Sequence, residues 1–125
     1  MGKTKVLIID DEKPFCSLIK MNLLLTGKFS VWTANDGWDG FKKARKWKPD
    51  IILLDVIMPK MGGLDTLKML KEDARTLPIP VIMLSALTDG KMKIRAGSLY
   101  AENYITKPVT TKQLIEKIES ALNIE

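Results

Sequence analysis

The chain has 125 residues, of which 46% are hydrophobic and 28% charged, with a formal net charge of +5 at pH 7. This length fits one domain, residues 1–125, and the composition excludes a disordered or fibrous protein. No apolar run approaches the roughly 20 residues that cross a bilayer, and the start lacks the apolar stretch of a secretory signal, so we expect a cytoplasmic protein without membrane contact.

In the first half of the chain, apolar runs of strand length occur at 5–9 and 29–34. The first run is followed by a predicted helix that begins near Pro14, a residue suited to the first helical turn, and ends at Gly27. A second helix is predicted over about 37–47. The apolar face of the first helix is expected to consist of Phe15, Leu18, Ile19 and Leu23.

In the second half, strand-length runs occur at 50–54, 80–84 and 103–106. A helix is predicted after the glycines at 62–63, and a weakly specified one over about 88–98. The last helix begins at a capping box formed by Thr110 and Gln113. The expected core residues of the third and last helices are Leu64, Leu67, Met69, Leu70, Leu114, Ile115, Ile118 and Leu122.

Strict alternation of strands and helices predicts a parallel sheet covered by helices on both faces, because parallel strands need crossover connections. The runs at 5–9, 50–54 and 80–84 are continuously apolar, as expected for strands buried on both faces.

The absence of histidine and the presence of a single cysteine, Cys16, restrict the available chemistry. Without histidine, Ser-His-Asp hydrolysis and histidine-ligated zinc are excluded. The lone thiol cannot form an internal disulfide and is expected to pack in the core. The basic segment 42–48 is interpreted as a solvated helix face rather than a nucleic-acid site.

Polar residues follow the predicted strands directly, at the sheet edge where ligands of such folds bind. They are Asp10, Asp11, Asp55, Ser85 and Lys107. Any one of them could simply be a strand end reaching water. Together, carboxylates without histidine or cysteine suit Mg²⁺, and a lysine and a serine beside it suit phosphoryl oxygens. The pattern therefore indicates phosphoryl transfer.

At these positions the chain resembles the receiver domain of two-component response regulators. The likeness is carried by "DDE" at 10–12, "DVIMPKMGG" at 55–63, "SA" at 85–86, Tyr104 and "KP" at 107–108. It implies a flavodoxin-like, doubly wound α/β fold, with a five-stranded parallel sheet of order 2-1-3-4-5 and five helices on both faces.

The resemblance also assigns roles. Asp55 would accept a phosphoryl group from a sensor histidine kinase or a histidine phosphotransfer protein, with Lys107 and Ser85 assisting. Mg²⁺ would be held by Asp10, Asp11, Asp55 and the backbone carbonyl of Ile57. Ser85 and Tyr104 would form a switch that alters the surface of the fourth helix, fifth strand and fifth helix. The domain would catalyse only its own phosphorylation and slow dephosphorylation.

The chain departs from the commonest family pattern at Gly62, at Tyr100 after the fourth helix, and at the apolar residues Ile57 and Leu87. Because the last two offer no group to position an attacking water, we expect slow self-dephosphorylation. The family usually has glycine where Tyr100 stands, so the sequence specifies the end of the fourth helix least well. The same holds for the surface that this helix helps to form with the fifth strand and fifth helix.

Two other functions compete with this interpretation. A Mg²⁺-dependent phosphohydrolase would use Asp55 as a transient nucleophile, but Val56 and Ile57 replace the expected DxD arrangement. A flavin carrier would need a phosphate loop where "DDEKP" stands. The signal would pass either to a downstream protein partner or to an output domain of a longer regulator. Homodimerisation on phosphorylation is an alternative. We expect no direct nucleic-acid contact by this domain.

Overall fold

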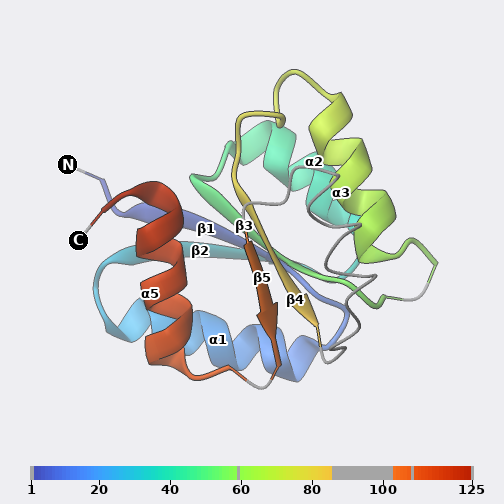
Figure 1. The fold of residues 1–125 in the computed structure, drawn as a ribbon. Coiled ribbons are helices and arrows are strands. Elements are labelled where there is room, and N and C mark those ends of the chain that lie inside the picture. Colours follow the sequence, from blue (N-terminus) through green and yellow to red (C-terminus); the bar gives the residue numbers. More distant parts are fainter. Residues whose placement is uncertain (1, 59, 86–102, 108, 125) are drawn as a thin grey trace.

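The computed structural model describes residues 2–58, 60–85, 103–107 and 109–124, and it shows a parallel sheet flanked by helices (Figure 1). In chain order its elements are β1 (Thr4–Ile9), α1 (Lys13–Leu25), β2 (Phe29–Ala34), α2 (Gly37–Trp47), β3 (Ile51–Asp55), α3 (Gly63–Glu72), β4 (Val81–Ser85), β5 (Asn103–Thr106) and α5 (Thr111–Leu122). None of the described helices is long and apolar enough to cross a membrane.

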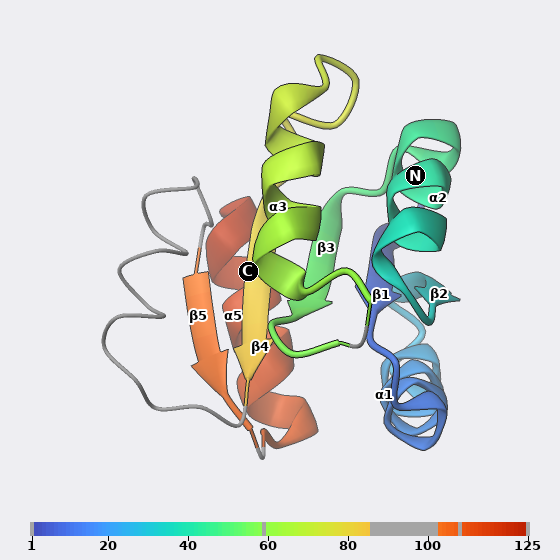
Figure 2. The ribbon, with the colours of Figure 1, turned by 90° about the vertical axis from the view of Figure 1, so that its right-hand side faces the viewer.

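The five strands are all parallel and lie in the order β2-β1-β3-β4-β5 (Figure 2), which confirms the predicted flavodoxin-like fold. In register, Ile9 pairs with Leu54, Asp55 with Leu84, and Ser85 with Thr106. The strands therefore end close together at one edge of the sheet. The helix predicted over 88–98 lies outside the described residues.

Two apolar layers hold the helices to the sheet. On the face covered by α2 and α3, the core includes Leu7, Leu54 and Leu67. On the opposite face, covered by α1 and α5, it includes Ile8, Leu53 and Leu114. Alternate residues of the same strand supply the two layers, as the two-residue period of a strand requires. This confirms that the central strands are buried on both faces.

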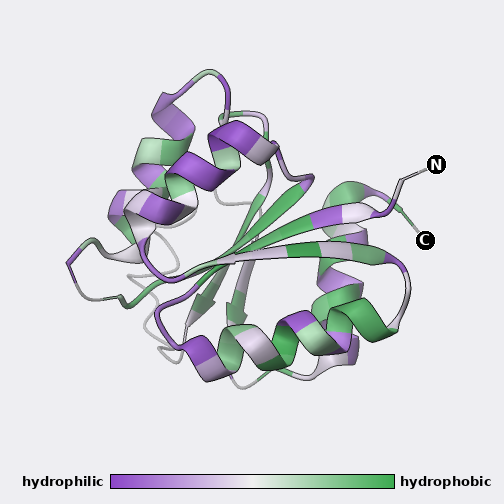
Figure 3. Ribbon diagram, turned by 180° about the vertical axis from the view of Figure 1, so that it is seen from behind, coloured by the Kyte–Doolittle hydropathy of each residue, from purple (hydrophilic) through white to green (hydrophobic). Residues whose placement is uncertain are grey.

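Helix α1 differs from its prediction at Leu18, whose surface is 51% exposed. The buried positions are Cys16, Ile19 and Leu23, and Leu18 lies about 100° around the helix from Ile19. Figure 3 accordingly shows hydrophobic residues around much of this helix. In α5, by contrast, the predicted capping box of Thr110 and Gln113 is present and fixes the start of the helix.

Gly63, the first residue of α3, sets the close approach of this helix to the end of β3. A Cβ atom at this position would lie 2.0 Å from the carbonyl oxygen of Asp55 and 2.6 Å from the Cα of Val56, whereas a Cβ at Gly62 would meet nothing nearer than 3.7 Å. Gly62 caps the helix without a side-chain hydrogen bond. Gly63, rather than Gly62, therefore allows α3 to begin close to the backbone of Asp55 and Val56.

We expect Gly63→Ala to lower the free energy of unfolding by about 3 kcal/mol, because the added methyl group must displace backbone atoms. Gly62→Ala, one residue away, adds a methyl group that makes only an ordinary van der Waals contact, and it should cost less than about 1 kcal/mol. Urea unfolding of the two variants measures both values. Equal losses in the two variants would contradict the steric explanation.

Candidate functional site

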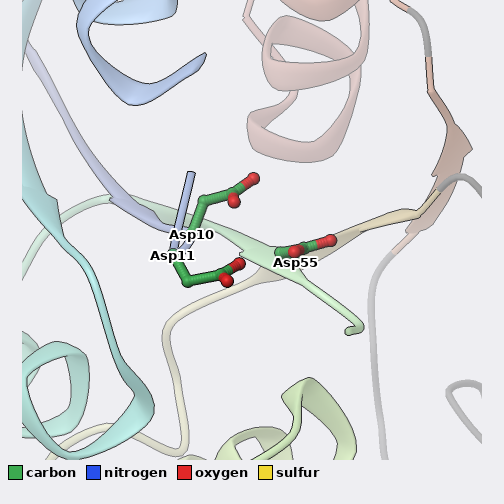
Figure 4. A group of neighbouring side chains, drawn as sticks. All are labelled: Asp10, Asp11 and Asp55. Carbon is green, nitrogen blue, oxygen red and sulfur yellow. The ribbon is translucent and has the colours of Figure 1, made fainter. Parts of the chain in front are cut away.

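The sheet brings the predicted site residues to its carboxyl edge. Asp10 directly follows β1, Asp55 ends β3, Ser85 ends β4, and Lys107 directly follows β5. The carboxyl groups of Asp10 and Asp11 extend from the end of β1 toward the end of β3, where Asp55 lies (Figure 4). Residues more than ninety positions apart therefore form one site.

Three carboxylates form the acidic part of the site. One oxygen from each of Asp10, Asp11 and Asp55 can be chosen so that all lie within 4.8 Å of one another. Asp10 is fully buried and Asp55 is only 5% exposed. An all-oxygen donor set with a partly exposed member fits Mg²⁺, which is held by a few carboxylates and retains several waters. The residues present therefore fit the predicted metal.

Lys107 supplies the positive charge. Its Nζ lies 2.7 Å from Oδ2 of Asp10, 3.3 Å from Oε1 of Glu12 and 3.5 Å from Oδ1 of Asp55. Its backbone N–H donates to the carbonyl oxygen of Ser85 at 2.7 Å, which ties the residue to the end of β4. One ammonium thus faces several carboxylates, leaving a net negative charge in a largely buried site.

Burial and this excess negative charge perturb the ionisation of Asp55 and Lys107. Burial, together with the negative charge of Asp10, raises the pKa of Asp55 to about 6, against the opposing effect of Lys107. Burial alone would lower the pKa of Lys107, but its hydrogen bond to Asp10 and the charges of Asp10 and Asp55 outweigh that effect and raise it. Lys107 therefore stays charged while Asp55 is costly to ionise.

The backbone of Asp10 is held by groups that the sequence prediction does not include. Its carbonyl oxygen accepts hydrogen bonds from the Cys16 thiol at 3.3 Å and from Nδ2 of Asn35 at 3.0 Å. Cys16 is buried, as predicted, and burial followed by the charge of Asp10 raises its pKa to about 11, so the thiol stays protonated. Asn35 directly follows β2, and that position is the sequence signal that could have found it.

Glu12 and Phe15 contact Lys107 from the start of α1. Glu12 is exposed, and it also pairs with the ammonium group of Lys107, a contact that the sequence does not reveal. The ring of Phe15 lies against the same ammonium, with Nζ 4.2 Å from its centroid. Sequence periodicity assigns Phe15 only to the core.

The other predicted site residues are Ser85, Tyr104 and Ile57, and they differ in burial. Ser85 is fully buried, and Tyr104 of β5 packs against the core on the α2 and α3 face. Tyr104 pairs in register with Met83, two residues before Ser85, so the two hydroxyl-bearing residues occupy the same face of adjacent strands. Ile57, two residues beyond Asp55, has a 57% exposed surface.

Three clustered carboxylates and a lysine thus lie at the carboxyl edge of a flavodoxin-like sheet, the edge at which α/β domains of this class bind their ligands. Residues 6–119 match the family model of the response regulator receiver domain. The chain therefore belongs to the response regulator receiver domains of two-component signalling systems.

Curated relatives support this assignment. The chain is 36% identical over 118 residues to the alkaline phosphatase synthesis transcriptional regulatory protein PhoP of Bacillus subtilis. It is equally similar to the DNA-binding dual master transcriptional regulator RpaA of Synechocystis. In each case the match covers 94% of this chain and 48% of the relative, so the chain spans about half the length of these proteins.

Solved structures agree in fold. The chemotaxis protein CheY4 of Vibrio cholerae superposes with a TM-score of 0.91 at 28% identity, covering 97% of this chain and 100% of that one. The response regulator domain of Thermotoga maritima CheB gives 0.87 at 31% identity, covering 99% of both chains.

Proposed function

We propose that this domain is a signalling switch in which Asp55 accepts a phosphoryl group. The observation that carries the proposal is the pairing of a buried Asp55 carboxylate with Lys107, whose Nζ lies 3.5 Å from Oδ1, inside a group of three acids. A dianionic phosphoryl group can approach these acids only when cations offset their repulsion. Asp55 belongs to such a group of acids.

The metal that offsets the remaining charge would be Mg²⁺, held by Asp10, Asp11, Asp55 and the backbone carbonyl of Ile57. When bound, it supplies positive charge for phosphoryl oxygens and for the charge that develops during transfer. The hydrogen bonds to the Asp10 carbonyl from Cys16 and Asn35 hold the β1 end of this ligand set in place.

The donor would be a phosphohistidine on a sensor kinase or on a phosphotransfer protein. An Asp55 oxygen attacks phosphorus, the P–N bond breaks, and the electron pair leaves with the imidazole nitrogen of the donor. Lys107 offsets charge on a phosphoryl oxygen, and Ser85 donates a hydrogen bond to another. Residues 1–125 contain no histidine, so the donor histidine lies outside this sequence.

Phosphorylation would act by shifting a population between two arrangements of Ser85 and Tyr104. These residues lie on one face of β4 and β5, so movement of the serine hydroxyl toward the phosphoryl group leaves space beside the tyrosine ring. The affected surface, which includes β5 and α5, would then bind a downstream partner, an attached output domain or a second copy. PhoP and RpaA are named as transcriptional regulators, and this chain matches only about half of each. Any DNA contact would therefore belong to an output region outside residues 1–125. The domain would act in the cytoplasm.

Intact-mass measurement tests the proposal. Purified protein treated with a small phosphodonor and Mg²⁺ should gain one phosphoryl group, and Asp55→Asn should gain none. Addition of EDTA should prevent the modification in the wild type. Equal modification of the wild type and Asp55→Asn would overturn the assignment, and sustained turnover of phosphate esters would favour a phosphohydrolase instead.

We expect the phosphorylated form to lose its phosphoryl group slowly, over minutes or longer. The exposed side chain at Ile57 is apolar and cannot position an attacking water. Ile57→Asn should shorten the lifetime by about 2- to 10-fold, the effect of one added hydrogen bond in the transition state. Ile124→Asn, at an exposed site just after α5, is the control. A wild-type lifetime of only seconds would contradict the prediction.

A further inference from the structure

Phe15 is an aromatic residue of α1 that contacts both the apolar core and Lys107. It lies in the first turn of α1, is partly buried, and packs against the apolar layer on this face of the sheet. The inward face of α1 is already filled by Cys16, Ile19 and Leu23. Core packing accounts for an apolar residue at position 15, whereas the contact with the ammonium group is specific to an aromatic ring.

The contact with Lys107 is directional. Nζ lies 4.2 Å from the ring centroid, within the range in which the negative face of an aromatic ring attracts an ammonium group. The carboxylates of Asp10, Asp55 and Glu12 lie within 2.7–3.5 Å of the same nitrogen. The ammonium is thus held between carboxylates and a ring face that cannot accept a conventional hydrogen bond.

The geometry points to Phe15 as a positioning residue for Lys107, holding its ammonium where it can contact a phosphoryl group on Asp55. This inference rests on the proposed function. A lysine side chain has four flexible methylene groups, and each uncontrolled rotamer would place the charge elsewhere. The ring restrains the charge without competing for it as a further carboxylate would. Glu12 also pairs with Lys107, but its side chain is 64% exposed, so water screens that contact.

Substitution at position 15 separates the role of the ring from that of its bulk. Phe15→Leu and Phe15→Met retain an apolar side chain without a π face, whereas Phe15→Tyr retains the π face. The first readout is the chemical shift of the Lys107 ε-methylene protons in the metal-free protein. A ring at this distance should shift them upfield in the wild type and in Phe15→Tyr, and the shift should vanish in the aliphatic variants.

The second readout is the rate constant for phosphorylation by phosphoramidate at saturating Mg²⁺. We expect a decrease of about fivefold in the folded aliphatic variants, the effect of one partly desolvated cation–π contact, and near wild-type rates in Phe15→Tyr. Thermal unfolding identifies the aliphatic variant whose stability matches Phe15→Tyr, so that loss of fold is not mistaken for loss of positioning.

The outcomes separate the two proposals. Failure of the wild type to become phosphorylated would overturn the proposed function. Normal phosphorylation of the wild type with equal rates in the aliphatic and tyrosine variants would overturn the role of Phe15. A wild-type protein whose Lys107 ε-protons show no upfield shift would also overturn it, whatever the kinetics.

Discussion

Asp55→Asn is expected to stabilise the metal-free protein by about 3 kcal/mol near pH 7.5. The folded protein raises the pKa of this carboxyl from 3.8 to about 6, through burial and then through the charge of Asp10. Each pKa unit corresponds to about 1.4 kcal/mol, so the ionised carboxylate costs about that amount in the folded state. Asparagine removes the charge at nearly unchanged size.

The pH dependence gives the sign of this effect. Between about pH 4 and pH 6 the folded chain binds the Asp55 proton more tightly than the unfolded chain does, so wild-type stability falls relative to Asp55→Asn as the pH rises. Above about pH 7 the difference is at its full value. Below about pH 4 the carboxyl is protonated in both states, and the two proteins should be equally stable.

Urea unfolding in EDTA across this pH range measures the difference. Asp65→Asn is the matched control, because Asp65 is exposed in the first turn of α3 and should contribute less than about 1 kcal/mol, in the opposite direction. Saturating Mg²⁺ should narrow the gap between the wild type and Asp55→Asn. A destabilised Asp55→Asn at pH 7.5 would show that Lys107 more than compensates the charge of Asp55.

The second large effect is expected at Lys107. Its side chain is 13% exposed, and its partner Asp10 is fully buried. Removing one member of a buried ion pair leaves the other charge without compensation, so Lys107→Met should lower the free energy of unfolding by about 3 kcal/mol at neutral pH. It should also lower the phosphorylation rate, because the phosphoryl oxygens lose their fixed cation.

A double substitution distinguishes charge from packing. Asp10→Asn combined with Lys107→Met removes both charges and should recover most of the lost stability, although not phosphorylation. Lys117→Met, at an exposed position of α5, is the control and should change stability by less than about 0.5 kcal/mol. If the double variant is no more stable than Lys107→Met alone, the loss comes from packing of the lysine stem.

The sheet and most of the site follow from short-range patterns. Continuous apolar runs identify buried parallel strands, and parallel strands bring their ends to one edge, so residue order alone groups Asp10, Asp55, Ser85 and Lys107. Apolar patterns predict the burial of individual residues less well in helices, because the rotation of a helix about its axis decides which of its apolar residues face the sheet. The apolar character of Leu18 does not show that this residue lies outside the buried stripe of Cys16, Ile19 and Leu23.

Contacts around Lys107 could not be predicted from the sequence for a related reason. The contacts of Glu12 and Phe15 depend on how the start of α1 lies against Lys107, which follows β5 far away in the chain. Asn35, just after β2, instead contacts the Asp10 carbonyl at the end of the neighbouring strand β1. Each of these residues also has a common alternative role, as an exposed acid, a core aromatic or a loop amide. Only the packed structure shows that they converge on Asp10 and Lys107.

Chemical trapping of the phosphorylated residue tests the central claim most directly. Borohydride reduces an aspartyl phosphate to homoserine, so peptide sequencing by mass spectrometry after phosphorylation and reduction identifies the acceptor. We predict homoserine at Asp55 alone, with Asp10 and Asp11 unchanged. Homoserine at either of those residues, or none at Asp55 in protein that has gained a phosphoryl group, would contradict the account.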